Sequence, residues 1–302
     1  MRFAKGHGTE NDFVILLDPD GRHELTAGLA ARLCDRRAGI GADGVLRAVR
    51  AAAAGTAAVG TAAAWSVAGA GAGGGAGAPV GRAEAPEWFM DYRNADGSLA
   101  EMCGNGIRVF ARYLAEHGLA GKPEFAVATR SGPRQVSLGD DGQVTVEMGT
   151  VTVLGPASAV VGGEAVEGLR VSVGNPHLAC LVDRPLEDFD LAAPPALDPA
   201  RFPGGANVEL VRETGPAAVA MRVHERGSGE TRSCGTGAVA AAMAAAWAHG
   251  QDGGTWRVAV PGGSLHVTLK DGGGWLTGPA VIVAEGDLDP AWLAASAAPG
   301  QG

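Results

Sequence analysis

Short apolar runs, separated by turns rich in glycine, asparagine and aspartate, make up most of the hydrophobic pattern of the chain. Runs of this length with Val, Ile, Leu and aromatic residues are typical of β-strands. A polar segment, 7–12, is expected to form a loop or bulge in an N-terminal hairpin. The pattern predicts strands within 13–17, 44–46, 88–93, 125–136, 143–148, 169–173, 178–182, 207–211, 217–224, 256–260, 264–269 and 281–284.

Three other stretches have the spacing or length of helices. Leu25, Leu29 and Leu33 recur every fourth residue, which predicts a helix within 25–37. Two apolar runs without proline, 107–114 and 238–247, each follow a turn punctuated by glycine. The second run is apolar almost all round, so we expect its helix to be enclosed by a sheet.

Residues 51–86 interrupt this pattern between two predicted strands. From 51 to 79 they are almost wholly Ala and Gly and carry no charge. A membrane span would contain more Leu, Ile and Phe and fewer glycines. We therefore interpret 51–86 as a low-complexity insertion.

Two stretches share a further pattern, in which a cysteine and a Gly-x-Gly turn precede one of the helical runs. The free N–H groups and the dipole of a helix favour an anion at its first turn. A cysteine at that position is stabilised as the thiolate, and a carboxylate can bind beside it. Two such positions suggest two thiols that act on one acidic substrate. The stretches are Cys103-Gly104-Asn105-Gly106 and Cys234-Gly235-Thr236-Gly237.

Either stretch alone also fits a purely structural explanation, because a lone cysteine is usually a small buried hydrophobe. The spacing argues against coincidence. Asn94 precedes Cys103 by nine residues, and Glu225 precedes Cys234 by the same nine. Both intervening segments are polar and rich in turn residues. Recurrence at matched spacing predicts a duplicated unit with one thiol in each copy.

Composition narrows the classes of function. The 302 residues suffice for two domains with cores of their own, and the net charge of −9 argues against a general nucleic-acid-binding surface. The four cysteines, at 34, 103, 180 and 234, fit no C-x-x-C metal spacing and are too few for a disulfide scaffold. The first residues have no apolar signal region. We therefore expect a cytoplasmic protein with reduced thiols.

Several motifs together resemble the diaminopimelate epimerases, a pyridoxal-independent family of bacterial lysine and peptidoglycan synthesis. The resemblance extends from residue 3 to about residue 240, outside the insertion. The motifs are His7-Gly8 with Asn11-Asp12-Phe13, Gly39-Ile40-Gly41-Ala42-Asp43-Gly44, Asn94-Ala95-Asp96-Gly97-Ser98 with the first cysteine stretch, Gly174-Asn175-Pro176-His177, Asn207-Val208, and Glu225-Arg226-Gly227 with the second stretch.

The resemblance implies an α/β fold of the α+β type with two similar domains. In each, a mostly antiparallel sheet wraps a central helix, and the active site lies in the cleft between the domains. The N-terminal domain would contain 1–128 and 278–290, including the insertion, and the C-terminal domain 129–277. Residues 291–302 would be a loose tail. The implied reaction interconverts LL- and meso-2,6-diaminopimelate with no metal and no cofactor.

Epimerisation removes a proton from one face of the α-carbon and returns one to the other face, which requires two acid–base groups. By resemblance these are Cys103 and Cys234, one of them thiolate and the other thiol at any moment. His177 and Glu225 are expected to bias which sulfur holds the proton. The residues expected to bind substrate are Asn11, Asn94, Gly104, Asn105, Asn175, Asn207, Glu225, Arg226, Gly235 and Thr236, with Arg226 on the distal carboxylate.

Other interpretations stay open. Glu225 and Arg226 also fit a surface ion pair, His177 a turn-capping histidine, and the asparagines left-handed turns. A two-thiol racemase of proline or hydroxyproline is the nearest alternative enzyme, and a substrate-binding module without turnover is the alternative from another class.

Two departures from the family concern the substrate contacts: Glu10 stands where the family usually has glycine, and Gly44 has no side chain. The expected partner is a small molecule and neither nucleic acid nor membrane. The sequence leaves the oligomeric state open, with a homodimer as one alternative.

Overall fold

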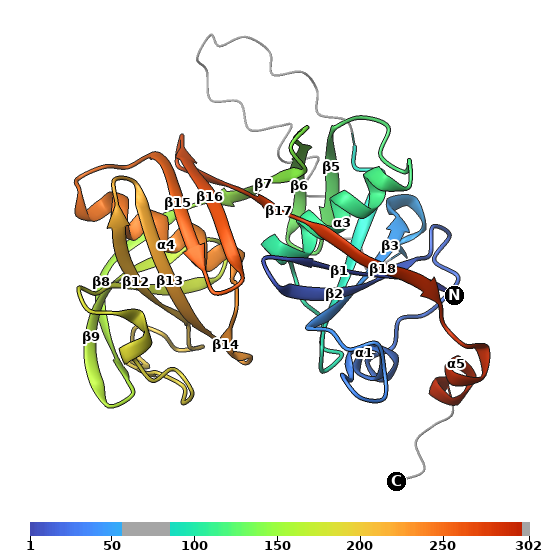
Figure 1. The fold of residues 1–302 in the computed structure, drawn as a ribbon, viewed down its shortest axis with the longest axis horizontal. Coiled ribbons are helices and arrows are strands. Elements are labelled where there is room, and N and C mark those ends of the chain that lie inside the picture. Colours follow the sequence, from blue (N-terminus) through green and yellow to red (C-terminus); the bar gives the residue numbers. More distant parts are fainter. Residues whose placement is uncertain (56–84, 298–302) are drawn as a thin grey trace. The chain divides into compact units, whose positions relative to one another are not determined.

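The computed structural model describes residues 1–55 and 85–297, so most of the insertion 51–86 lies outside the described residues. The chain forms two compact units. The first contains Met1–Gly8, Asp12–Val144 and the segment from Ala280 onward, and the second contains Thr9–Asn11 and Thr145–Pro279. Figure 1 labels their elements. Both units are mixed α/β, with many strands and few helices, as the sequence predicts.

The first unit surrounds helix α3. Strand β2 pairs parallel with β3, β3 antiparallel with β4, β4 parallel with β5, and β5 antiparallel with β6. The last strand returns to this unit, where β18 pairs antiparallel with β1. The elements are β1 (Arg2–Gly8), β2 (Asn11–Leu17), α1 (Ala27–Cys34), β3 (Gly44–Arg50), the 3₁₀ turn η1 (Ala51–Ala53), β4 (Trp88–Asn94), α3 (Gly104–Glu116), β5 (Glu124–Thr129), β6 (Gly132–Leu138), β18 (Val281–Asp287) and α5 (Pro290–Ala297).

The second unit surrounds helix α4. Strand β7 (Gln143–Thr150) begins in the first unit and continues into the second. The remaining elements are β8 (Thr152–Val161), β9 (Glu164–Ser172), β10 (Pro176–Leu181), the 3₁₀ turn η3 (Leu186–Asp188), β11 (Ala196–Leu197), β12 (Asn207–Gly215), β13 (Ala218–Glu225), β14 (Gly229–Thr231), α4 (Gly235–Ala248), β15 (Gly254–Val260), β16 (Gly263–Lys270) and β17 (Gly273–Pro279).

The two units repeat one topology, which confirms the duplication predicted from the spacing of the thiol stretches. In the second unit β10 pairs parallel with β12, β12 antiparallel with β13, β13 parallel with β15, and β15 antiparallel with β16. This is the order of β2 to β6 in the first unit, and in both units the helix follows the third strand of the series. Asn94 and Glu225 end equivalent strands, so the shared offset of nine residues reflects an equivalent connection.

The two central helices differ in how completely they are enclosed. Nearly every residue of α4 is buried, because strands β9, β10, β12, β13 and β15 to β17 pack around it. Its many alanines allow this close approach, and the predicted enclosure is confirmed (Figure 1). Helix α3 packs against β1, β3, β6 and β18 and keeps Arg112 and Glu116 at the surface as an ion pair. No helix in the ranges 1–55 and 85–297 is long and apolar enough to cross a membrane.

The structure corrects several predicted strands. The predicted strand 125–136 is a hairpin, because the chain turns after β5 and Gly132 takes a φ of +96°. Strands β8, β17 and the first half of β9 were not predicted. Their side chains alternate between the sheet and solvent, and glycines lower their hydrophobicity, so they contain no apolar run. The pairing of β5 with both β4 and β6 also keeps these strands in the first unit, past the expected domain boundary at residue 128.

The expected loose tail is wrong for residues 291–297, which belong to helix α5. Asp289 begins this helix, since its carboxylate accepts from the backbone N–H groups of Ala291 at 2.8 Å and Trp292 at 2.9 Å. The Trp292 ring lies 4.5 Å from the guanidinium carbon of Arg32, and its Nε1 donates to the Ala38 carbonyl. Trp292 and Leu293 pack against the hydrophobic core beside α1. The helix is too short for its periodicity to be informative.

Candidate active site

Cys103 and Cys234 occupy the same structural position in the two units. Each is the N-cap residue of its helix, with backbone angles of φ −134°, ψ 122° and φ −122°, ψ 118° respectively. Each sulfur accepts a hydrogen bond from the backbone N–H three residues later, of Gly106 or Gly237, at 3.4 Å. Both sulfurs therefore lie at the positive end of a helix dipole, which favours the thiolate.

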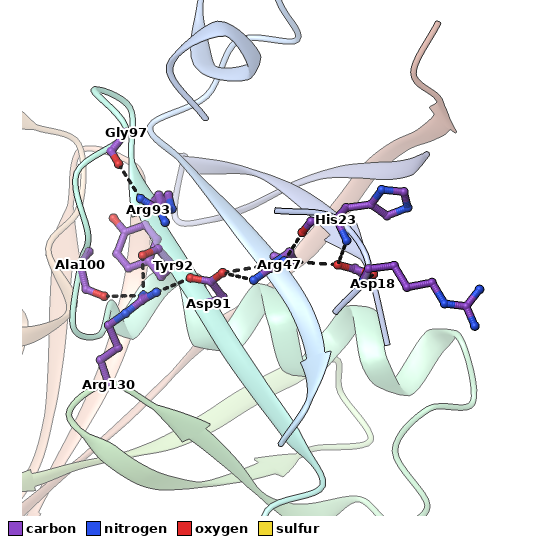
Figure 2. A network of polar contacts seen from close by, with 10 residues as sticks. Asp18, His23, Arg47, Asp91, Tyr92, Arg93, Gly97, Ala100 and Arg130 are labelled. Atoms are coloured by element: carbon purple, nitrogen blue, oxygen red, sulfur yellow. Dashed lines mark hydrogen bonds and ion pairs between the residues drawn. The ribbon is translucent and has the colours of Figure 1, made fainter. Parts of the chain in front are cut away.

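The segment that leads to Cys103 is held by a buried ion-pair network, which Figure 2 shows. Asp91, on β4, accepts from Arg47 Nε at 3.0 Å and Nη2 at 2.8 Å, and pairs with Arg130 through its other oxygen. Arg130 also donates to the carbonyl oxygens of Tyr92 at 2.8 Å and Ala100 at 3.2 Å. The network thus links strands β3 and β4 and the turn between β5 and β6 to the loop that ends at the cysteine.

A buried arginine lies behind the first turn of α3. Arg108 has no exposed surface, and its guanidinium donates to the Gly104 carbonyl at 3.0 Å and to Asn105 Oδ1 at 2.8 Å. Gly8, on β1, makes room for it, because a Cβ at that position would lie 2.9 Å from Arg108 Nη2. The His7-Gly8 motif therefore serves packing as well as the β1–β2 turn.

In the second unit a chain of hydrogen bonds leads from a buried carboxylate to the Cys234 sulfur. His177 faces an oxygen with each ring nitrogen: Nδ1 is 2.7 Å from Glu209 Oε1, and Nε2 is 3.0 Å from Asn175 Oδ1. Asn175 Nδ2 donates to Thr236 Oγ1 at 3.4 Å, which lies 3.5 Å from Cys234 Sγ. His177 thus joins the Glu209 carboxylate to Asn175, and Asn175 and Thr236 continue the chain to the thiol.

Negative charge also surrounds Cys234. Burial raises the pKa of this thiol well above its usual range, and the carboxylates of Glu225 and Glu209 raise it further, against hydrogen bonds from Thr236 and Gly237. Burial likewise raises the pKa of Glu225, although hydrogen bonds from Thr231, at 2.5 Å, and from Cys234 oppose this. These surroundings favour the neutral thiol at Cys234.

The other site residues expected from the sequence are distributed between the units. Asn207 Oδ1 accepts from the backbone N–H of Arg226 at 2.9 Å, and the exposed Arg226 guanidinium donates to the Gly204 carbonyl. Asn94, at the end of β4, donates to Ser98 within its own turn. Asn11 opens β2 after a turn in which Glu10 has a φ of +60°. Asn94, Gly104 and Asn105 lie with Cys103 in the first unit, whereas Asn11, Asn175, His177, Asn207, Glu225, Arg226, Gly235 and Thr236 lie with Cys234 in the second.

Two residues beside the cysteines were missed by the sequence analysis. Glu209 is fully buried, and its Oε2 has no hydrogen-bond partner among the residues that the structure describes. Its signal in the sequence is a charged residue inside the otherwise apolar strand 207–211. Arg108 gives a similar signal, as a charge among the buried positions of α3.

All four cysteines are free thiols. Within the described ranges no group of three or more His, Cys, Asp or Glu side chains is arranged to hold a metal ion. The groups that the described residues bring to this site are thiols, a histidine, carboxylates and backbone N–H groups.

Solved structures share the fold at low sequence identity. A phenazine biosynthesis protein of the PhzF family from Bacillus anthracis superposes with a TM-score of 0.66 at 15% identity, over 95% of this chain and 98% of that one. A hydroxyproline epimerase from Agrobacterium vitis gives 0.59 at 15% identity, over 95% and 91%. These likenesses show the fold, whose two similar domains agree with the repeated topology.

Sequence comparison identifies the family. The profile of the family described as diaminopimelate epimerase matches residues 3–154 and 169–287. A diaminopimelate epimerase of Thermobifida fusca is 58% identical over 288 residues, covering 95% of this chain and 98% of that protein. One of Mycolicibacterium smegmatis is 52% identical over 301 residues, covering 97% and 98%. The chain therefore belongs to the diaminopimelate epimerase family and is an isomerase.

Proposed function

We propose that the protein interconverts LL-2,6-diaminopimelate and meso-2,6-diaminopimelate with Cys103 and Cys234 as its two acid–base groups. The reaction would serve lysine and peptidoglycan precursor synthesis in the cytoplasm, where thiols stay reduced. The observation that carries the proposal is the equivalent N-cap position of the two sulfurs at the starts of α3 and α4. Two equivalent thiols suit a reaction that must run in both directions.

In the proposed mechanism one sulfur is a thiolate and takes the α-proton from one face of the carbon. The electron pair left on the α-carbon is delocalised into the adjacent carboxylate. The second sulfur, a thiol, then gives its proton to the opposite face. The pair of sulfurs ends in the reversed protonation state, so the reverse reaction begins from there. Both sulfurs must reach one α-carbon, which a disulfide between Cys103 and Cys234 under mild oxidation would test.

The reacting carboxylate gains charge during this step and needs donors that are already in place. Backbone N–H groups at the starts of the two helices are suited to this, because they have no partner within their own helices. Gly104 and Asn105 would supply them in the first unit, and Gly235 and Thr236 in the second. No pyridoxal ring would then be required to hold the charge.

The distal carboxylate and the amines would be held by the remaining polar residues of the site. Arg226 suits a bidentate grip on a carboxylate, and Asn207 fixes its backbone. Asn11, Asn94 and Asn175 would complete recognition of the amine and carboxylate groups. The two strand ends that carry Asn94 and Glu225 are equivalent in the repeat, so each unit would contribute one polar group from this position.

Solvent deuterium exchange into diaminopimelate tests the proposal, with proline as the alternative substrate. We expect deuterium at the α-carbon of diaminopimelate and none in proline, which has no distal carboxylate for Arg226. Cys103→Ala and Cys234→Ala should each lower kcat/KM by about 10³-fold or more, because an acid–base group is lost.

Cys34→Ala is the matched control, because Cys34 is a buried thiol of α1 in the hydrophobic core. It should keep its activity. Full activity in either active-site variant would contradict the two-thiol mechanism, and exchange into proline alone would favour the racemase.

A further inference from the structure

Arg108 is the charged residue of the Cys103 half of the site to which neither the fold nor the family resemblance assigns a role. Its side chain begins one turn into α3 and runs back toward the start of the helix, as long side chains in helices do. The guanidinium ends against Gly104 and Asn105, the two residues that follow the cysteine. It is therefore attached to the segment proposed to bind the reacting carboxylate.

The contact with Gly104 fixes the direction of a proposed substrate-binding group. The Gly104 carbonyl belongs to the planar peptide that also contains the Asn105 N–H, and the two point in opposite directions. Because Arg108 Nη1 holds the carbonyl at 3.0 Å, it also holds the Asn105 N–H pointing away, out of the start of the helix. The second contact, from Nη2 to Asn105 Oδ1 at 2.8 Å, keeps the Asn105 side chain from competing for that position.

The charge of the guanidinium has a second consequence. Arg108 is fully buried, and a buried charge interacts strongly with another charge close to it. Burial lowers the pKa of Arg108 to about 10, while attraction to Cys103 acts in the opposite direction. The same attraction must favour the thiolate of Cys103, since coupling between two charges is mutual.

We propose that Arg108 is a positioning residue for the Cys103 half of the site: its guanidinium orients the Gly104–Asn105 peptide, and its buried charge keeps Cys103 as the thiolate before substrate binds. With the thiol favoured at Cys234, Cys103 is the sulfur that takes the first proton. The catalytic meaning of this inference rests on the proposed function, whereas the ionisation of Cys103 can be measured without substrate.

Other charged groups lie on the strands that pack against α3, and most have partners elsewhere. Lys5 pairs with Asp12, Arg2 with Glu285, and Arg47 with Asp18 and Asp91. The others on these strands and on α3 are His7, Arg50, Arg134, Asp287, Arg112, Tyr113 and Glu116. Except for Arg112, which only the control variant replaces, these groups are unchanged in the variants below, so their effects cancel in the comparison.

The test measures thiol ionisation by the pH dependence of iodoacetamide alkylation, with the Cys103 and Cys234 peptides quantified by mass spectrometry. Arg108→Met should raise the Cys103 midpoint by about one pH unit, because an opposite charge is lost. Alkylation of Cys103 near neutral pH should therefore be about 10-fold slower. In Arg108→Lys, which keeps the positive charge, the Cys103 midpoint should stay close to its wild-type value. The Cys234 midpoint should not change in either variant.

The kinetics separate charge from orientation. Lysine keeps the charge but cannot donate from a planar fork to two acceptors, so Arg108→Lys should still raise KM for diaminopimelate by about 10-fold through one lost orienting contact. Arg112→Met is the matched control, one turn further along α3 in a partly exposed ion pair with Glu116. It should change neither the midpoint nor KM.

A Cys103 midpoint that is unchanged in folded Arg108→Met, with folding verified by circular dichroism, would overturn the proposal. If that variant does not fold, Gly8→Ala replaces it, because the added Cβ presses on Arg108 Nη2. It should shift the Cys103 midpoint upward by a smaller amount, and no shift would count equally against the inference. A wild-type protein that fails to epimerise diaminopimelate would refute the proposed function while leaving the alkylation result valid.

Discussion

Helices α3 and α4 begin with the same backbone geometry, yet the charges around their first turns have opposite sign. At the start of α3 a buried charge is supplied by Arg108, a residue of the helix itself. At the start of α4 the corresponding position, five residues after the cysteine, is the buried Val239. The charges there are the buried carboxylate of Glu209, from β12, and the partly buried carboxylate of Glu225, from β13.

The comparison shows how a duplicated unit can supply two acid–base groups that differ in protonation state. Two identical thiols at two identical helix starts would ionise together. In the proposed mechanism one sulfur is a thiolate and the other a thiol, and the opposite charges would provide that difference while the repeated backbone keeps both sulfurs in the same local geometry.

The largest expected effect concerns the network that supports the Cys103 loop. Asp91→Asn removes the charge that pairs with Arg47 and Arg130, all three with side chains no more than 16% exposed. We expect a loss of about 3–5 kcal/mol in the free energy of unfolding, because Arg130 loses the carboxylate it pairs with and Arg47 keeps only Asp18. Urea denaturation of the wild type and the variant measures this loss.

The control for this variant comes from the second unit. Position 222 corresponds to position 91 in the repeat, and there Arg222 pairs with the more exposed Glu230. Glu230→Gln should cost about 1 kcal/mol or less. Equal losses in the two variants would show that the first network has no special importance.

A methyl group added in the first turn of each helix should affect the two units differently. In Gly237→Ala the new Cβ would lie 2.8 Å from Glu209 Oε1, which is buried and held by His177. In Gly106→Ala its nearest neighbour is Leu46 Cδ2 at 3.3 Å, which can yield. We expect kcat/KM to fall by about 100-fold in the first variant, equivalent to about 2.7 kcal/mol, and by less than about 10-fold in the second. The reverse order would contradict the assignment of Glu209 to the Cys234 half.

Removal of one carboxylate should make Cys234 easier to ionise. Glu225 raises the pKa of this thiol through its negative charge, so Glu225→Gln should lower the alkylation midpoint of Cys234 by about one pH unit. The Cys103 midpoint is the internal reference and should stay unchanged. Glu213→Gln, an exposed change on β12 in a pair with His249, is the matched control. A Cys234 midpoint that rises or stays constant in Glu225→Gln would be evidence against this electrostatic account.

The smallest effect is expected at Glu10, where the family usually has glycine. Glu10 has a φ of +60°, which costs a non-glycine residue about 1 kcal/mol, and it pairs with Arg232 at the surface. Glu10→Gly removes the backbone strain but also loses the ion pair with Arg232, so the two effects on stability nearly cancel. The free energy of unfolding, measured by thermal denaturation, should change by no more than about 0.5 kcal/mol. A loss well above 1 kcal/mol would show that the ion pair with Arg232 matters more than its exposure suggests.

Much of this arrangement could be predicted from local patterns. The position of both cysteines at helix starts, the enclosure of 238–247 and the duplication follow from turn chemistry, helical length and matched spacing. Strands β8 and β17 could not be predicted, because alternation with glycine and solvent-facing residues leaves no apolar run. Helix α5 was missed because the contacts of Trp292 with Arg32 and Ala38 come from the opposite end of the sequence.

The sequence by itself therefore determined the helix starts, the thiols and the repeat, since each depends on residues within one turn of a helix or on spacing along the chain. The tertiary structure alone decided which charge lies behind each thiol. Arg108 is buried by the close approach of Gly8, and Glu209 meets His177 because β10 and β12 pair in parallel. The strength of a charge–charge interaction depends on burial and distance in space, and neither is fixed by separation along the chain.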